Sequence, residues 1–156
     1  MRSAVCTIQL SVVMLLMSGT QTPLTSQIQA CSLITRSEAA QILAKPELAS
    51  AQVIAVDEED CGYLGSGFDI HTELLKSVPG WSAWKNDLIK QGKAEAVEGI
   101  GDEAAFSKDG NGDYLVVARK GDRIVTVTMY ASEGTAAQLK PKLIQLATVA
   151  MGKLPG

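Results

Sequence analysis

Residues 113–130 have the sequence DYLVVARKGDRIVTVTMY, and this stretch decides the fold. It contains two runs rich in β-branched residues, 113–119 and 122–130, joined by a short Lys-Gly-Asp segment. Such runs favour strands, and a tight turn containing glycine between them predicts an antiparallel hairpin. One of the two alternating apolar sets is expected to face a helix, because an amphipathic helix needs a surface to cover.

The antiparallel pattern continues upstream of this hairpin. Asn111-Gly112 predicts a primed hairpin turn that leads back to a strand over 103–107. Residues 68–74 alternate cleanly, which places Phe68 and Ile70 on one face and His71 on the other. Further short strands are expected over 51–56, 61–64 and 96–98.

Three segments have helical signals. Thr35-Arg-Ser-Glu38 is a capping box that predicts a helix ending before Pro46. Residues 82–91 have helical spacing after the Pro79-Gly80 break, and residues 135–153 carry an apolar stripe that Pro141 either splits or enters in its first turn. The sequence therefore predicts an α+β fold, with one antiparallel sheet of about five to seven strands covered by N-terminal, middle and C-terminal helices.

The first thirty residues predict an export signal. Arg2 precedes the apolar stretch 8–17, and a polar segment with small residues follows up to Ala30. This order is typical of a secretory signal peptide. A retained anchor helix is the alternative, but the apolar stretch is shorter than the ~20 residues of a membrane span. We expect a single domain over 31–156, in the periplasm of a bacterial envelope or secreted.

Cysteine usage agrees with export. Cys6 lies in the expected signal, which leaves Cys31 and Cys61 as a pair. In an oxidising compartment such a pair indicates a disulfide. A lipid anchor at Cys31 is the alternative, because Ile28-Gln-Ala-Cys31 loosely resembles a lipobox. Lipidation would leave Cys61 as an odd thiol.

The charge of the chain limits its partners. It carries 14 Lys and Arg against 17 Asp and Glu, a net charge of −3, and the basic residues are scattered. Nucleic acids and anionic membrane surfaces need a clustered positive field. We therefore expect no nucleic-acid partner and no stable membrane span, but a protein or small-molecule partner of unknown identity.

Several segments together resemble a known family. They are ACSLITRSEAA at 30–40, the Cys-Gly-Tyr strand at 61–63, GIGDEA at 99–104, LVVARKGDRIVTV at 115–127 and a final apolar helix. This combination resembles the DUF3558-type exported bacterial proteins, which are similar to the Mog1p/PsbP-like fold. The resemblance implies a curved antiparallel sheet between helices and an envelope location. It brings no reaction and no catalytic residue.

The candidate binding residues are two tryptophans and a glycine-rich loop. Trp81 and Trp84 are either a core anchor or one wall of a ligand groove, because half-buried tryptophan is favoured at binding surfaces. Gly99, Gly101 and Asp102 precede a strand, which is not the context of a phosphate-binding turn. A tight turn that only glycine fits explains them, and they are also candidates to line a groove.

Other polar residues offer little chemistry. His71 is the one histidine of the chain, and it lies on the polar face of a strand between Asp69 and Glu73, which favours a half-exposed strand histidine over the base of a Ser–His–Asp site. One histidine and two paired cysteines are too few for a Cys/His zinc site. The acidic spacing in 109–113 imitates a calcium loop, but Tyr114 and Lys120 stand where that loop needs Gly and Glu. The acidic turn 57–60 is expected to be a solvated loop, with ion binding left open.

The sequence thus predicts an exported binding or accessory protein with no catalytic residue, metal or cofactor. Its binding surface is expected on the open sheet face or between the sheet and the tryptophan helix. The alternative is a carboxylate-based enzyme or enzyme inhibitor of the bacterial envelope, because paired carboxylates can cleave glycosides across a cleft. Its candidate residues are Asp69, Glu73, Asp102 and Glu103.

Overall fold

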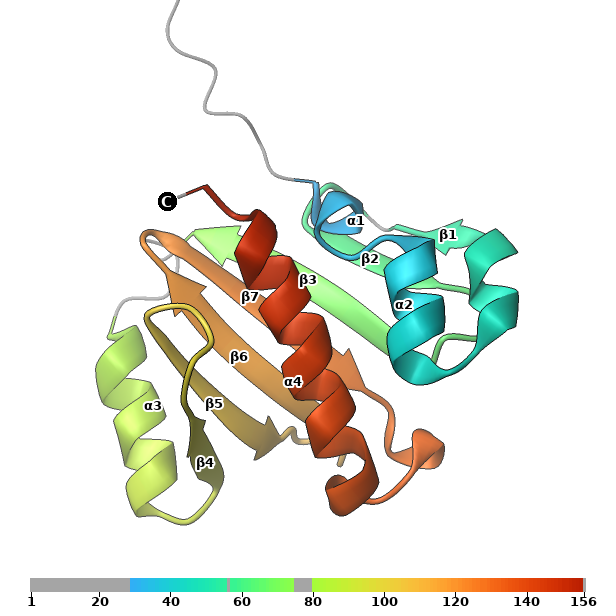
Figure 1. The fold of residues 1–156 in the computed structure, drawn as a ribbon. Helices are drawn as coiled ribbons and strands as arrows, with labels where there is room; N and C mark the ends of the chain where they lie inside the picture. Colours follow the sequence, from blue (N-terminus) through green and yellow to red (C-terminus); the bar gives the residue numbers. More distant parts are fainter. Residues whose placement is uncertain (1–28, 56, 75–79, 156) are drawn as a thin grey trace, which may run out of the picture.

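The computed structural model describes residues 29–55, 57–74 and 80–155, and Figure 1 shows their arrangement. The expected signal up to residue 28, Val56 and Pro79 lie outside these residues. A seven-stranded antiparallel sheet has the order β1-β2-β3-β7-β6-β5-β4. The elements are α1 Ala30–Leu33, α2 Arg36–Leu43, η1 Pro46–Ser50, β1 Val53–Ile54, β2 Asp60–Tyr63, β3 Phe68–Leu74, α3 Trp81–Lys90, β4 Ala94–Val97, β5 Glu103–Lys108, β6 Tyr114–Lys120, β7 Arg123–Met129, η3 Ala131–Glu133 and α4 Ala136–Lys153. The predicted α+β fold is confirmed.

The β6–β7 hairpin lies in the middle of the sheet, and its register defines two faces. Val116 pairs with Val127, and Val117 pairs with Thr126. Directly paired residues project to the same face, and successive residues project to opposite faces. Val116 and Val127 therefore share one face, which we call the first face, while Val117 lies on the second face.

Helices α4, α2 and α1 cover the first face. Thr135 caps α4 through a capping box with Gln138. The helix then runs unbroken through Pro141, which lies beyond its first turn, so neither predicted alternative, a split at this residue or a place in the first turn, is found. Proline removes only one backbone donor, and the packing of Leu139 and Leu143 on either side holds the helix to the sheet. The buried residues of α4 are Leu139, Leu143, Leu146, Ala147, Ala150 and Met151.

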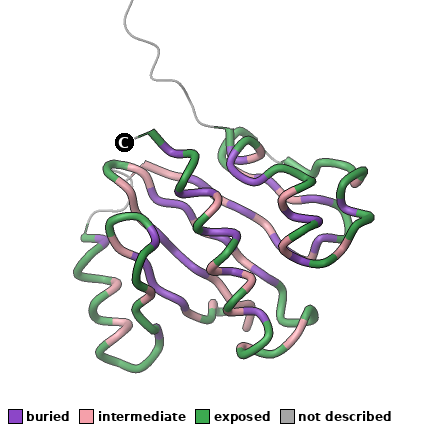
Figure 2. The backbone as a smooth tube through the Cα atoms, viewed as in Figure 1, coloured by how far each residue is buried: buried purple, intermediate pink, exposed green. Residues whose placement is uncertain are grey.

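Helix α3 packs on the second face, where it joins a separate small core. Trp81 is buried against Val117 and Ile124, and Leu115 packs at the margin of this cluster. Figure 2 shows that α3 is otherwise largely exposed, in contrast to the buried central strands. The second face is thus covered near β4 to β6 by a ten-residue helix.

The hairpin turns differ in type. Gly121, with φ of 59°, begins the two-residue turn between β6 and β7, as predicted. The predicted primed turn at Asn111-Gly112 is wrong, because both primed types need positive φ at the first central residue, and Asn111 does not have it. The Asp109 carboxylate instead accepts hydrogen bonds from the backbone N–H groups of Asn111 and Asp113, which stabilises a longer loop.

A disulfide fastens the N-terminal helices to the sheet. Cys31 and Cys61 are bonded with a Cα–Cα distance of 5.1 Å, as predicted from the cysteine count. The Cys31 sulfur, which a lipid anchor would need, is therefore bonded to Cys61. Nearby, the Tyr63 hydroxyl donates a hydrogen bond to the Ile34 carbonyl. The disulfide is compatible with an extracellular, oxidising compartment.

The docking of α4 generates the first prediction. Leu146 is fully buried against the first face, so Leu146→Ala should lower the free energy of unfolding by ~2–5 kcal/mol. Gln145→Ala, an exposed neighbour on the same helix, is the matched control and should change it little. Guanidinium unfolding followed by circular dichroism measures both. Equal unfolding midpoints for Leu146→Ala and the wild type would contradict the packing of α4 on this sheet.

Candidate functional site

A cavity of about 590 Å³ lies between α3 and strands β4 to β6 on the second face. Its size falls within the ~300–1,000 Å³ typical of small-molecule sites. The sheet supplies an apolar floor and α3 supplies an apolar wall, because the helix meets the sheet at Trp81 without covering it completely. The apolar lining residues are Trp81, Trp84, Leu88, Ala94, Ala105, Leu115 and Val117.

The two tryptophans have different environments. Trp81 is 3% exposed and belongs to the core, whereas Trp84 is 50% exposed. Their ring centroids are 5.5 Å apart, and both line the cavity. The two readings of the sequence therefore both apply, since Trp81 is a core anchor and Trp84 is a half-exposed wall. The buried Trp81 Nε1 has no hydrogen-bond acceptor among the described residues.

Charged residues surround the apolar interior. Lys85, Lys93 and Lys108 line the cavity together with one acidic residue, Asp109. They come from α3, from the segment before β4 and from the end of β5. Their separation along the chain explains why no basic motif announces them in the sequence.

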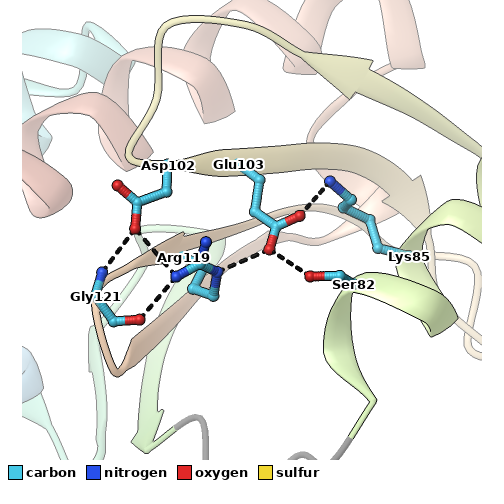
Figure 3. Close-up of polar contacts among 6 residues, drawn as sticks. All are labelled: Ser82, Lys85, Asp102, Glu103, Arg119 and Gly121. Carbon is cyan, nitrogen blue, oxygen red and sulfur yellow. Dashed lines mark hydrogen bonds and ion pairs between the residues drawn. The ribbon is translucent and has the colours of Figure 1, made fainter.

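A partly buried ion-pair network holds α3 on the sheet. The Lys85 ammonium lies 2.5 Å from Glu103 Oε2, and Arg119 Nε donates to Glu103 Oε1 at 2.7 Å. The Ser82 hydroxyl donates to the same Oε1 at 2.8 Å (Figure 3). Strands β5 and β6 and helix α3 are thus joined at one carboxylate.

The network sets the charge of Glu103. Burial raises the pKa of this carboxyl, but hydrogen bonds from Lys85, Arg119 and Ser82 outweigh burial and lower the pKa from 4.5 to about 2. Glu103 is therefore a fixed anion at neutral pH and is unsuited to donating a proton. This weakens its candidacy for acid–base chemistry.

The predicted glycine-rich loop lies away from the cavity. Gly101 has φ of 59°, and a Cβ there would lie 2.3 Å from the Arg119 carbonyl oxygen, so this position needs glycine. Asp102 accepts hydrogen bonds from Arg119 Nη1 and the Gly121 N–H. Gly99 has φ of 80° in the same β4–β5 turn. None of the three lines the tryptophan cavity.

A second cleft of about 640 Å³ lies near β1, β2 and η3. Asp69 lines it, and burial raises the pKa of this carboxyl even though hydrogen bonds from Tyr130 and Thr128 lower it. The other carboxylates there are engaged with cations or a histidine: Glu133 pairs with Lys45, and Asp60 contacts His71 Nδ1 at 2.9 Å. Glu73 lies on the same strand and face as Asp69 but does not line the cleft.

In the acidic turn 57–60, one carboxylate stabilises the turn itself. The Asp57 carboxylate accepts the N–H groups of Glu59 and Asp60. In the part of the chain that the structure describes, no group of three or more His, Cys, Asp or Glu could hold a metal ion. Among the same residues, no helix has both the length and the apolar character needed to cross a membrane.

Comparisons with protein-family models, with curated proteins and with solved structures give no match. The site is therefore interpreted from its own geometry.

The Glu103 network generates the second prediction. Because folding lowers the pKa of Glu103, its stabilisation is complete above pH 4.5 and is lost as the pH falls toward about 2. Glu103→Gln should lower the free energy of unfolding at pH 7 by about 1–3 kcal/mol and remove this part of the acid sensitivity. Urea unfolding at several pH values measures it, with the exposed Glu98→Gln as control. An unchanged acid slope in Glu103→Gln would contradict the network.

Proposed function

We propose that this chain is an exported binding or accessory protein that takes an apolar ligand into the cavity between α3 and the sheet. The observation that carries the proposal is Trp84, a half-exposed tryptophan whose ring lies tilted against that of the buried Trp81 along an apolar cavity. Large exposed apolar groups in a concave site favour ligand contact.

A further feature supports the proposal. The network at Glu103 fixes the first turns of α3, so this wall of the cavity is preformed. A preformed wall reduces the entropy lost on binding.

The location is part of the same proposal. The signal-like first thirty residues support export to the periplasm or the medium, and the Cys31–Cys61 bond suits such a compartment. Membership of the DUF3558-type exported proteins stays a prediction from the sequence. It would add an envelope location without adding a reaction.

Binding of the neutral dye Nile red tests the ligand site and generates the third prediction. Trp84→Ala should weaken dye binding about tenfold, as loss of a central aromatic contact does. It should leave the melting temperature nearly unchanged, because Trp84 is half-exposed. Tyr130→Ala removes another exposed aromatic side chain outside this cavity and is the matched control. Equal dye binding by Trp84→Ala and the wild type would reject the cavity as the site.

One observation favours the alternative, a carboxylate enzyme. Asp69 is a partly buried carboxyl with a raised pKa in a cleft, which is typical of acid–base residues. The Tyr130 hydroxyl beside it also has a raised pKa, caused by burial and by the Asp69 charge. Without a second uncommitted carboxyl in the cleft, the two-carboxylate mechanism of glycosidases lacks a partner group.

Asp69→Asn generates the fourth prediction. A raised folded-state pKa means that ionised Asp69 costs stability above its pKa, and this cost disappears as the pH falls below 3.8. The variant should therefore be more stable than the wild type at pH 7, with a difference that shrinks in acid. Asp87→Asn, on the exposed side of α3, is the control for thermal unfolding. A less stable Asp69→Asn at pH 7 would make this carboxylate structural and remove the support for an enzyme.

A further inference from the structure

The second cleft, near β1, β2 and η3, is lined by apolar side chains that remain in contact with water. Ile54, Leu64 and Tyr130 line it and are 49%, 61% and 43% exposed. Its volume of about 640 Å³ falls within the range of small-molecule sites. Exposed apolar side chains that gather in one concavity, unlike single ones scattered over a surface, indicate a place where a partner or ligand binds.

This cleft is separate from the tryptophan cavity. Strand β1 forms one edge of the sheet, whereas α3 lies near β4 at the other edge (Figure 1). Asp69 pairs with Thr128, which pairs with Leu115, so Asp69 lies on the second face two strands away from the small core under α3. Ile54 shares this face, because it pairs with Gly62 and Gly62 pairs with Asp69. The two hollows have no lining residue in common.

The charge of the cleft lining is negative. Its acidic residues are Asp60, Asp69 and Glu133, and no lysine or arginine of the described chain lines it. Lys45 pairs with Glu133 at 2.6 Å and cancels one charge. A hydrogen bond leaves a carboxylate charged, so the contact with His71 neutralises Asp60 only where the imidazole is protonated. Asp69 has no ion-pair partner among the described residues, so the net charge is negative in either state of His71.

Asp60 and Asp69 are near enough to share one cation. Asp60 pairs with His71, and Asp69 stands two positions before His71 on β3, so the two carboxylates are diagonal neighbours on one face. Diagonal neighbours lie about 7–8 Å apart, which lets one ammonium group between them contact both side chains. Burial raises the pKa of Asp69, and the charges of Asp60 and Asp113 raise it further, against hydrogen bonds that lower it. A bound cation would offset this unfavourable environment of the ionised carboxylate.

The surroundings of the two carboxylates favour an organic cation over a metal ion. The Tyr130 side chain is hydrogen-bonded to Asp69, and its ring lines the same cleft. An aromatic ring attracts an ammonium group through its negative face. In the described part of the chain, no group of three or more His, Cys, Asp or Glu is suited to a metal ion, and calcium requires six to eight oxygen ligands. Ile54 and Leu64 add apolar surface for the rest of an organic molecule.

We propose that the second cleft is a further binding site, which takes an organic ammonium ion between Asp60 and Asp69. The apolar part of this ligand packs against Leu64 and Tyr130. The inference is independent of the ligand proposed for the tryptophan cavity, because the two sites share no residue. A neutral alcohol of the same shape would lose the ion pairs, and a carboxylate would be repelled.

Isothermal titration calorimetry of the intact protein tests the inference with three probes of similar shape, which are 2-phenylethylammonium, 2-phenylethanol and 3-phenylpropanoate. At pH 7 the ammonium should bind about three- to tenfold more tightly than the alcohol, as partly exposed ion pairs allow. This preference should decrease with added salt, because salt screens exposed charges. The carboxylate should bind most weakly.

Variants then assign the preference to particular residues. Asp69→Asn should bind the alcohol as the wild type does and lose the preference for the ammonium. Asp87→Asn changes the net charge equally at an exposed position outside the cleft and should keep the preference. Leu64→Ser should weaken the ammonium and the alcohol by a similar factor, whereas Val53→Ser, at an exposed apolar position outside the cleft, should weaken neither. Thermal unfolding checks that the four variants fold.

Trp84→Ala separates the two sites. A retained preference for the ammonium in this variant supports the inference, even where Nile red rejects the tryptophan cavity. Loss of ammonium binding in Trp84→Ala would place the probe in the tryptophan cavity and overturn the inference. Equal affinities for the ammonium and the alcohol, or an unchanged preference in Asp69→Asn, would also overturn it. Displacement of the ammonium by micromolar calcium would do so as well, since it would identify a metal site.

Discussion

The structure depends on one constraint, which is that the central β6–β7 hairpin carries buried apolar residues on both faces, although Arg119, Thr126 and Thr128 share the second face with them. Val116 and Val127 are fully buried on the first face, and Ile124 is 1% exposed on the second. An antiparallel sheet can leave one face in water only if that face is polar. Here both faces need a cover, so the chain places helices on either side of the hairpin (Figure 1).

The two covers are unequal, and the cavity results from this inequality. Helix α4 has 18 residues and is joined on the first face by the disulfide-linked N-terminal helices. Helix α3 has ten residues and is held at its start by Trp81 and by the Glu103 network. Toward its end the helix leaves Leu115, Ala105 and Ala94 lining open space. A wall anchored at one end provides room for a ligand without exposing the core.

Local signals in the sequence predict the fold well, because they depend on neighbours a few residues apart. The strand alternation over 68–74 and 113–130, the capping box at Thr35 and the cysteine pair are all found in the structure. The predictions at Asn111-Gly112 and Pro141 are wrong for a different reason. There, side-chain contacts of Asp109 and the packing of α4 outweigh the usual preference of the residue type.

The candidate site could be predicted only in part, because its charges come together through the fold. The sequence identifies the tryptophan pair, but nothing in it shows that Glu103 meets Lys85 across 18 positions. The charged residues of the cavity lining are brought together in the same way. Lys85 lies on α3, Lys93 precedes β4 and Lys108 ends β5, so they line one cavity although no two of them are neighbours in the sequence. A basic run, which is the signal that sequence analysis can detect, is therefore not needed to place several cations around one site.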